Sequence, residues 1–269
     1  MTDSSRKTAL VTGASAGIGK AFARQLARQD FDLVITARRR DRLEAVQREI
    51  SAEHGRRVEI VTADLADPAA PQAMFDELGR MGIAIDVLVN NAGYGIPQKY
   101  VQTSWKQQAD LIQVLVTSVA HLTHLFLPGM IERGFGRVIN IASLAGLLHA
   151  APGSTLYAAA KSFVIKMSES LALELAGTGV QVTAVCPGFT FSEFHDVAGT
   201  RRRVSRLPSA LWMDADTVAR QGLQAALEGR VVMVNGAVNK LIASTMKHLP
   251  DPLARGIMLR QARNFRAVD

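Results

Sequence analysis

The chain has 269 residues, of which 48% are hydrophobic and 20% are charged, and its formal net charge is +7. This length is sufficient for one large α/β domain with a substantial core, and the composition excludes a disordered chain. No apolar run approaches the roughly 18 residues that span a bilayer, and the first residues lack the apolar centre of a secretory signal. We therefore expect a cytoplasmic protein without an integral membrane segment.

The positive charge gathers in short arginine clusters at 38–40, at 201–203 and in the last residues. Aromatic residues make up only 6% of the chain, too few for a platform on which nucleic-acid bases stack. We expect no nucleic-acid partner, and we interpret the first cluster as directed to a cofactor and the others as solvated surface or contacts to an anionic partner. The single cysteine, Cys186, excludes an intrachain disulfide and lies in an apolar run typical of a buried side chain.

In chain order, apolar runs rich in β-forming residues alternate with segments of helical spacing. We predict strands at 8–12, 32–37, 58–62, 87–90, 137–141, 180–185 and 231–234. We predict helices at 17–29, 41–54, 68–80, 105–133, 157–176 and 214–228. Most strands are apolar throughout, as expected where helices cover both faces of a sheet. The alternation predicts a doubly wound, Rossmann-type parallel sheet of about seven strands with helices on both faces, in a single domain spanning 1–269.

Three segments lie outside this alternation. Residues 1–6 form an N-terminal tail, and 189–211 combine glycine, proline and a charge run, which predicts a loop that closes over a substrate. Residues 237–269 carry two amphipathic stretches separated by Pro250 and Pro252. They predict a helical extension packed on its own domain or on a second subunit. Contact with a membrane surface is the alternative, disfavoured by a short apolar face without a tryptophan anchor.

The first strand leads directly into a glycine-rich turn and a helix. The run is Thr12-Gly13-Ala14-Ser15-Ala16-Gly17-Ile18-Gly19. Glycines permit a tight turn and close backbone approach, and the amides of a helix N-terminus face an anion, so we predict a pyrophosphate site at Gly13, Ser15, Ala16, Gly17, Ile18 and Gly19. The glycine spacing is three then one, unlike the usual dinucleotide fingerprint. An ordinary connection is the alternative, but the strand before the turn and the helix after it favour cofactor binding.

The second strand ends at two arginines, Arg38 and Arg39. A site for NAD(H) would place an acidic side chain here to hold the ribose hydroxyls, whereas arginine suits a 2′-phosphate. We therefore favour NADP(H) over NAD(H), with Arg38 as the first candidate and Arg39 as the second. Exposed arginines at a helix start are the alternative.

Tyr157 and Lys161 are four residues apart within a predicted helix, so they share one face of it. A free phenol is a poor acid or base at neutral pH, and an adjacent cation lowers the pKa of a phenol by favouring its phenolate. A tyrosine tuned in this way can exchange a proton with a carbonyl or alcohol oxygen. Such pairs are also common on solvated helices, so the spacing alone does not establish a catalytic role.

Together with Asn90-Asn91-Ala92-Gly93, Ser143 and Pro187-Gly188, these features resemble the short-chain dehydrogenase/reductase family. The resemblance extends from Lys7 to about Val234, with the motifs in the family's order. It implies a single-domain NADP(H)-dependent carbonyl reductase that forms a homodimer or homotetramer. It assigns the remaining cofactor contacts to three segments that follow strands. They are Asp64 and Leu65 at the adenine, Asn90, Ala92 and Gly93 beside the cofactor and bracing the sheet, and Pro187, Gly188 and Thr190 at the nicotinamide carboxamide.

The resemblance also implies the catalytic roles. NADPH would deliver hydride to a carbonyl carbon while Ser143 binds the carbonyl oxygen, Tyr157 protonates it, and Lys161 lowers the pKa of the tyrosine and binds the ribose. Alternatives remain for the serine: Ser143 could only cap a turn, and Ser154 and Thr155 are rival hydroxyls.

One position departs from the family pattern. Many members carry an asparagine in the helix before the fifth strand, where it helps to hold a water that links the lysine to solvent. Leu115 occupies this position here, which puts the proton relay in doubt, although a backbone carbonyl, Thr117 or Ser118 could substitute. The alternative function is therefore a scaffold or sensor that binds NADP(H) with little or no turnover.

No metal site is predicted. His121 and His124 are three apart on one helix without an evident third ligand, and His195 could line the substrate pocket or lie on a loop surface. The segments that would shape the pocket, 94–101, 144–155 and 189–211, contribute apolar side chains such as Ile96 and Leu148. We therefore expect a small carbonyl or alcohol substrate with an apolar body.

Overall fold

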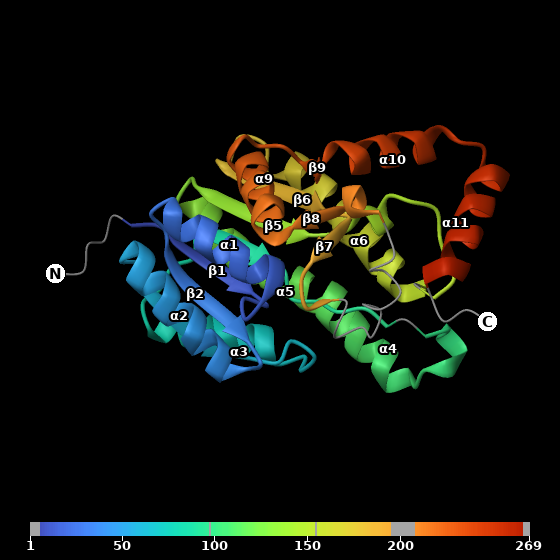
Figure 1. The fold of residues 1–269 in the computed structure, drawn as a ribbon. Helices are drawn as coiled ribbons and strands as arrows, with labels where there is room; N and C mark the ends of the chain where they lie inside the picture. The colour runs from blue at the N-terminus through green and yellow to red at the C-terminus, as the bar shows by residue number, and fades with distance from the viewer. Residues whose placement is uncertain (1–5, 97, 154, 195–207, 266–269) are drawn as a thin grey trace.

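The computed structural model describes residues 6–96, 98–153, 155–194 and 208–265. Its centre is a seven-stranded parallel sheet in the order β3-β2-β1-β4-β5-β6-β9 (Figure 1). The strands are β1 (Thr8–Thr12), β2 (Asp32–Ala37), β3 (Val58–Thr62), β4 (Val87–Asn90), β5 (Gly136–Ile141), β6 (Val180–Cys186) and β9 (Val232–Val234). The strand order reverses direction between β1 and β4, and ligands of doubly wound sheets bind at such a switch point. The predicted fold class is confirmed.

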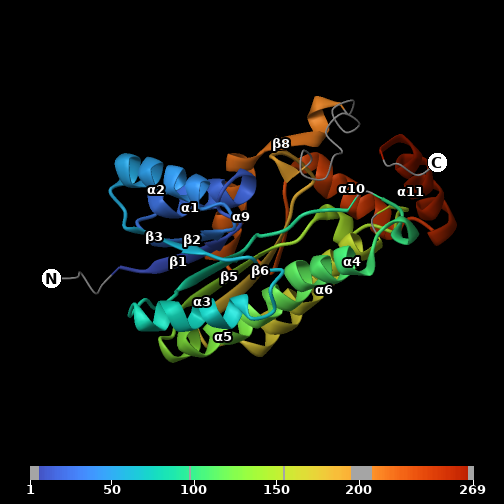
Figure 2. The same ribbon diagram turned by 90° about the horizontal axis from the view of Figure 1, so that it is seen from below.

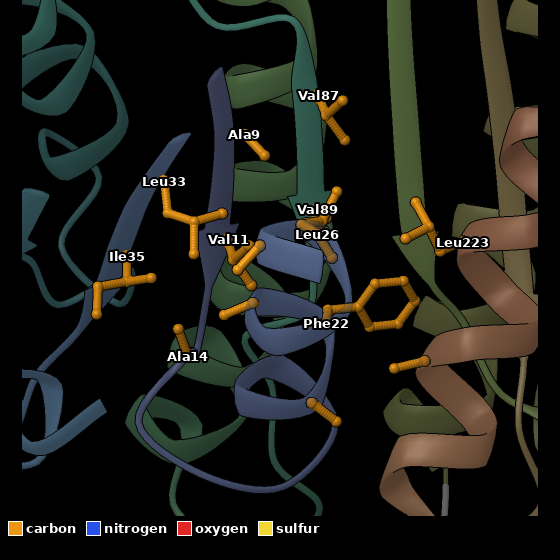
Figure 3. Packing of buried hydrophobic residues seen from close by; sticks show 14 of the residues in the cluster. Ala9, Val11, Ala14, Phe22, Leu26, Leu33, Ile35, Val87, Val89 and Leu223 are labelled. Atoms are coloured by element: carbon orange, nitrogen blue, oxygen red, sulfur yellow. The ribbon is translucent and has the colours of Figure 1, made fainter. Parts of the chain in front are cut away.

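Helices cover both faces of the sheet (Figure 2). One face carries α1 (Gly17–Arg28), α2 (Arg40–His54) and α9 (Ala215–Leu227). The other carries α3 (Ala70–Arg80), α4 (Trp105–Ile112), α5 (Ser118–Glu132) and α6 (Thr155–Glu174). In Figure 3, the ring of Phe22 on α1 points toward α9, and Phe22, Leu26 and Leu223 of α9 belong to one buried cluster on this face of the sheet. This packing fixes the start of α1, and with it the glycine turn, at the carboxyl end of β1.

The helix that crosses the back of the sheet is interrupted by one turn of π-helix, Gln113–Thr117, between α4 and α5. By length and composition alone, the whole segment Trp105–Glu132 could cross a membrane, but half of its apolar window is buried inside the fold. Leu115, Leu122 and Met130 belong to the core beneath the sheet. A core helix of a globular domain passes the same test, and this packing accounts for the apolar character of the segment.

The first residues of the predicted substrate loop form a strand, so an irregular loop over all of 189–211 was the wrong expectation. β7 (Phe189–Phe191) pairs in parallel with β8 (Trp212–Asp214) in a small second sheet. The ring of Phe191 stacks on Trp212 with centroids 4.7 Å apart, and this aromatic pairing across strands stabilises the sheet. The described part of the loop continues only to Phe194 and resumes at Pro208.

The C-terminal extension forms two helices, α10 (Ala237–His248) and α11 (Asp251–Phe265). Met246 and Met258 pack with Leu148 and Leu249 in a small apolar cluster. Nε2 of His149 lies 3.3 Å from Oδ1 of Asp251, which links the extension to the loop before α6. Of the arrangements considered from sequence, packing on its own chain is therefore observed.

Candidate active site

The turn after β1 depends on glycine at each of its three glycine positions. Gly13 and Gly17 have φ of +66° and +55°, in the left-handed region that favours glycine. A Cβ on Gly19 would lie 2.4 Å from both Nδ2 of Asn91 and the carbonyl oxygen of Gly13. α1 begins here with no acidic residue in its first turn, so its amides face an open, uncompensated site. The turn fits the diphosphate of a dinucleotide.

Asn91 fastens this turn to the end of β4. Its side-chain amide donates to the carbonyl oxygens of Thr12 (2.8 Å) and Gly13 (3.2 Å). Oγ1 of Thr12 in turn accepts from the backbone amides of Asn91 (2.9 Å) and Ala92 (3.0 Å). Asn91 was not among the predicted site residues, although it lies in the Asn90-Asn91-Ala92-Gly93 run. It holds the two strands together at the switch point.

The arginines after β2 differ in what they contact. Arg38 makes no hydrogen bond or ion pair with any residue in the described ranges, and it lines the cavity. Arg39 donates from Nη2 to Oγ of Ser15 (3.5 Å) and to Oε2 of Glu193 (2.9 Å). Arg42 binds the other carboxylate oxygen of Glu193. Arg42 and Glu193 were both missed from sequence, because Glu193 comes from a loop 154 residues away from Arg39.

Of the residues predicted to contact the adenine or to lie beside the cofactor, most line the cavity and one lies in the core next to it. Asp64, Leu65, Ala92 and Gly93 line the cavity. Asn90 lies outside that lining: its amide donates to Oγ1 of Thr123 (3.1 Å) and Oδ1 of Asn140 (2.9 Å). Asn90 therefore braces β4 against β5 and α5, and its side chain contributes no surface to the cavity.

Ser143 follows β5, and its side chain makes a local contact. Its Oγ accepts a 3.1 Å hydrogen bond from the amide of Ala145 at the start of the short helix Leu144–Gly146. The capping considered from sequence is thus present, but it uses only an acceptor site, and the hydroxyl proton can still be donated. A Cβ on Gly146 would lie 2.7 Å from the backbone carbon of Lys161. This close approach sets Ser143 against the helix that carries Tyr157 and Lys161.

Lys161 is almost completely buried. Its Nζ donates to the carbonyl oxygen of Ile141 at 2.6 Å and lies 5.8 Å from the centre of the Tyr157 ring. Burial, which disfavours the charged form, lowers the pKa of Lys161 to about 8. Cys186 is also fully buried, as predicted from its apolar run, and this burial raises the pKa of its thiol to about 12.

Leu115 lies within the π-helical turn and is fully buried. A Cβ on Gly93 would lie 2.8 Å from Cδ2 of Leu115 and 4.0 Å from Nζ of Lys161. The leucine side chain therefore approaches the same side of Gly93 that faces the lysine. Single π-helical turns frequently mark functional sites, and this one packs against α6, the helix that carries Tyr157 and Lys161.

The loop after β6 forms another part of the cavity wall. The carbonyl oxygen of Pro187 accepts from the amide of Leu144 (2.9 Å), and the buried hydroxyl of Thr190 donates to the carbonyl oxygen of Gly188 (3.2 Å). A Cβ on Gly188 would lie 2.5 Å from Oδ1 of Asn239, which reaches the loop from α10. Asn239 was also missed from sequence, since nothing in its own segment indicates that α10 packs here.

Comparison with known proteins decides the family. The model of the short chain dehydrogenases matches residues 7–202. The chain belongs to the short-chain dehydrogenase family. Sulfoacetaldehyde reductase 2 of Chromohalobacter salexigens is 38% identical over 189 residues, which cover 69% of this chain and 73% of the relative. The family is one of NAD(P)-dependent oxidoreductases, and this chain is such an enzyme.

Solved short-chain dehydrogenases with bound cofactors have the same fold. One from Sphingobium yanoikuyae, in complex with NADPH, has a TM-score of 0.78 and 32% identity, and covers 91% of this chain and 96% of its own. One from Burkholderia phymatum, in complex with NAD, has a TM-score of 0.79 and 27% identity, and covers 91% and 94%. Structural neighbours of this dehydrogenase therefore bind either nucleotide.

In this short-chain dehydrogenase, one cavity of about 1230 Å³ joins the residues predicted to bind the nucleotide with Ser143, Tyr157 and Lys161. The predicted site residues all line it, with the exception of Gly19 and Asn90. Beyond Tyr157 the lining is largely apolar and includes Leu148, Ile242 and Met246. Phe194 adds a ring 5.8 Å from that of Tyr157. The C-terminal extension thus forms part of the wall that a substrate would face.

Ser154, His195 and the arginines at 201–203 lie outside the described residues. Within the described ranges, no group of three or more His, Cys, Asp or Glu side chains could hold a metal ion.

Proposed function

We propose that this dehydrogenase is an NADPH-dependent carbonyl reductase, or an alcohol dehydrogenase in the reverse direction, with Tyr157 as its general acid and base. One observation carries the proposal: Ser143, Tyr157 and Lys161 line the same cavity as the glycine turn and Arg38. This arrangement brings a proton donor and a nucleotide site to one substrate position.

NADPH, when bound, supplies a hydride to the carbonyl carbon. The protein's own residues handle the oxygen. Ser143 donates a hydrogen bond to the carbonyl oxygen and so holds it beside Tyr157. The phenol of Tyr157 then transfers its proton to that oxygen as negative charge develops there.

Tyr157 is distinguished from the other tyrosine of the cavity by its neighbours. Tyr94 also lines the cavity, but its pKa is raised by burial and by the carboxylate of Asp110. Tyr157 instead has the ammonium of Lys161 beside its ring. A neighbouring cation favours the phenolate, so Tyr157 is the residue suited to release a proton near neutral pH.

The choice of NADP(H) over NAD(H) rests on Arg38 and Arg39. An arginine fork binds a phosphate in two-pronged fashion, and no acidic side chain occupies the end of β2 to bind the ribose hydroxyls instead. The Sphingobium relative in complex with NADPH supports this choice, and the Burkholderia relative in complex with NAD shows that the fold alone does not dictate it.

The substrate we propose is a ketone or aldehyde with an apolar body, because the cavity beyond Tyr157 is lined by apolar side chains of the loop before α6 and of the C-terminal helices. We also propose a cytoplasmic homodimer or homotetramer. Exposed apolar side chains on the helices α4 and α6, among them Trp105, Phe163 and Leu173, support assembly through this face, and light scattering of the purified protein tests it.

The test of the activity is the oxidation of NADPH by purified protein with a panel of apolar ketones and aldehydes. The alternative is a non-catalytic NADP(H)-binding scaffold, motivated by Leu115 near Lys161. We expect the wild type to reduce carbonyls with NADPH and Tyr157→Phe to lose most of this activity. Tight NADPH binding without turnover across the panel would favour the scaffold.

A further inference from the structure

A short segment of the substrate loop crosses the cofactor side of the cavity. We call residues Ser192, Glu193 and Phe194 the strap. A Cβ on Gly17 would lie 2.9 Å from Cβ of Ser192, so the strap begins directly against the glycine turn. Phe194 ends it beside Tyr157, and a Cβ on Gly95 would lie 3.2 Å from the tip of its ring. Three consecutive residues therefore connect the diphosphate turn with the catalytic tyrosine.

Glu193, the middle residue, is bound by two arginines. One carboxylate oxygen accepts from Nη2 of Arg39 at 2.9 Å, and the other accepts from Nη1 of Arg42. These hydrogen bonds lower the pKa of Glu193, so it is charged throughout the neutral range. A carboxylate held between two guanidinium groups presents the same chemistry as a phosphate bound there.

We propose that Glu193 is a cofactor-specificity residue: its carboxylate binds Arg39 and Arg42, and the 2′-phosphate of NADP(H) must displace it from Arg39 in order to bind that arginine as well as Arg38. This inference rests on the proposed assignment of Arg39, beside Arg38, to the 2′-phosphate. NAD(H), which lacks the phosphate, binds without displacing Glu193. Glu193 therefore weakens NADP(H) binding relative to NAD(H) binding, and the preference for NADP(H) is smaller than the arginines alone would give.

The displacement has a consequence for the active site. Since Glu193 lies between Ser192 and Phe194 in the chain, release of its carboxylate removes one of the contacts that hold this segment, and with it Phe194, in place beside Tyr157. NADP(H) thereby lets the ring of Phe194 move away from Tyr157 and widens the cavity there, and NAD(H) does not. Trp212, which stacks on Phe191 just before the strap, provides a fluorescent reporter of this movement.

The first test measures the dissociation constants of NADPH and NADH for three proteins: the wild type, Glu193→Gln and Glu44→Gln. Glu44 is the matched control, because it pairs with Arg40 of the same arginine cluster at 3.0 Å but does not reach across the cavity. We expect Glu193→Gln to tighten NADPH binding about three- to tenfold, the range for two exposed ion pairs that no longer compete, and to leave NADH within about twofold. Glu44→Gln should leave both constants within about twofold.

The second measurement follows Trp212 emission in a Trp105→Phe background, with 2′,5′-ADP and 5′-AMP as probes that lack the nicotinamide. In the wild type, only 2′,5′-ADP should change the emission, and in Glu193→Gln neither probe should change it further. The role of Glu193 would be rejected, and the proposed function kept, if Glu193→Gln changed the dissociation constants of NADPH and NADH equally. An emission change with 5′-AMP equal to that with 2′,5′-ADP would have the same meaning. Failure of wild-type protein to bind NADPH would overturn the proposed function as well.

Discussion

The ammonium group of Lys161 donates a 2.6 Å hydrogen bond to the carbonyl oxygen of Ile141 at the end of β5. This contact orients the lysine from the strand side, while Tyr157 lies one turn earlier on the same helix. The lysine thus has a fixed position that does not depend on the residue at position 115. The buried ammonium lowers the stability of the fold, because one carbonyl oxygen only partly compensates for the loss of its hydration.

Replacement of Lys161 by methionine is expected to stabilise the fold while it abolishes reduction. Lowering the lysine's pKa from 10.5 to about 8 corresponds to a cost on the order of 3 kcal/mol for the charged form. The lost hydrogen bond to Ile141 offsets about 1–3 kcal/mol of this gain. We expect urea unfolding at neutral pH to show a net gain of about 1 kcal/mol, with carbonyl reduction no longer detectable.

The sign of the pH dependence provides an independent check on Lys161→Met. Below about pH 8 the lysine is protonated in both the folded and the unfolded states, so the full cost of burial is present. Between that pH and about 10.5 only the unfolded state keeps its proton, so the wild type gains stability relative to the variant. Lys166→Met, exposed on the same helix, should show no such trend. A destabilisation by Lys161→Met that is the same at both ends of this range would contradict the argument.

Tyr157→Phe should lower kcat by about 10²–10⁴-fold with little change in NADPH affinity, because it removes the proton donor and leaves the ring in place. The control is Tyr94→Phe, which deletes a hydroxyl from the same cavity whose pKa is shifted away from neutral pH. Steady-state kinetics with the best ketone of the panel should show a loss within about tenfold for Tyr94→Phe. Comparable losses for the two variants would show that neither hydroxyl is the specific acid.

Gly19→Ala is expected to weaken NADPH binding strongly and to destabilise the protein, since its Cβ would lie 2.4 Å from both Asn91 and the Gly13 carbonyl. The start of α1 must then move away from the turn that it helps to form. Gly79→Ala is the matched control, because Gly79 also lies in a helix but has no atom within 4 Å of the new Cβ. That change should stabilise by about 0.5–1 kcal/mol and leave NADPH binding intact. Isothermal titration calorimetry and thermal unfolding would measure both effects.

The parts of the site that follow from local pattern could be predicted from the sequence. Gly13 and Gly17 lie in the turn between a strand and a helix, and Tyr157 and Lys161 share a helical face. Each of these features could be predicted from residues that are close together in the sequence. Contacts between distant segments had no such signal. Glu193 meets Arg39 across 154 residues because the chain after β7 turns toward β2, and Asn239 meets Gly188 because α10 packs on the β6 loop. The π-helical turn around Leu115 likewise interrupts a stretch whose apolar spacing reads as one helix.

Leu115→Asn tests whether the residue behind Gly93 limits proton supply. A buried amide without partners in this apolar cluster should cost about 2–4 kcal/mol of stability. We expect kcat to change less than about tenfold, because Lys161 keeps its own hydrogen bond to Ile141. Leu111→Asn, in the same cluster but one turn earlier, controls for the loss of stability. A rise in kcat specific to Leu115→Asn would instead show that the wild-type enzyme is limited by resupply of protons.

Arg38→Gln should raise the dissociation constant of NADPH by about ten- to a hundredfold, the effect of losing a charge-assisted hydrogen bond to phosphate, and leave that of NADH almost unchanged. Arg38 lines the cavity without an ion-pair partner in the described part of the chain, so its charge is available to the ligand. Arg40→Gln is the control, because Arg40 is exposed and already paired with Glu44. Fluorescence titration of each variant with NADPH and with NADH measures the two dissociation constants. An equal loss of NADPH and NADH affinity would place Arg38 at the adenosine or the diphosphate, and the preference for NADP(H) would then depend on Arg39 alone.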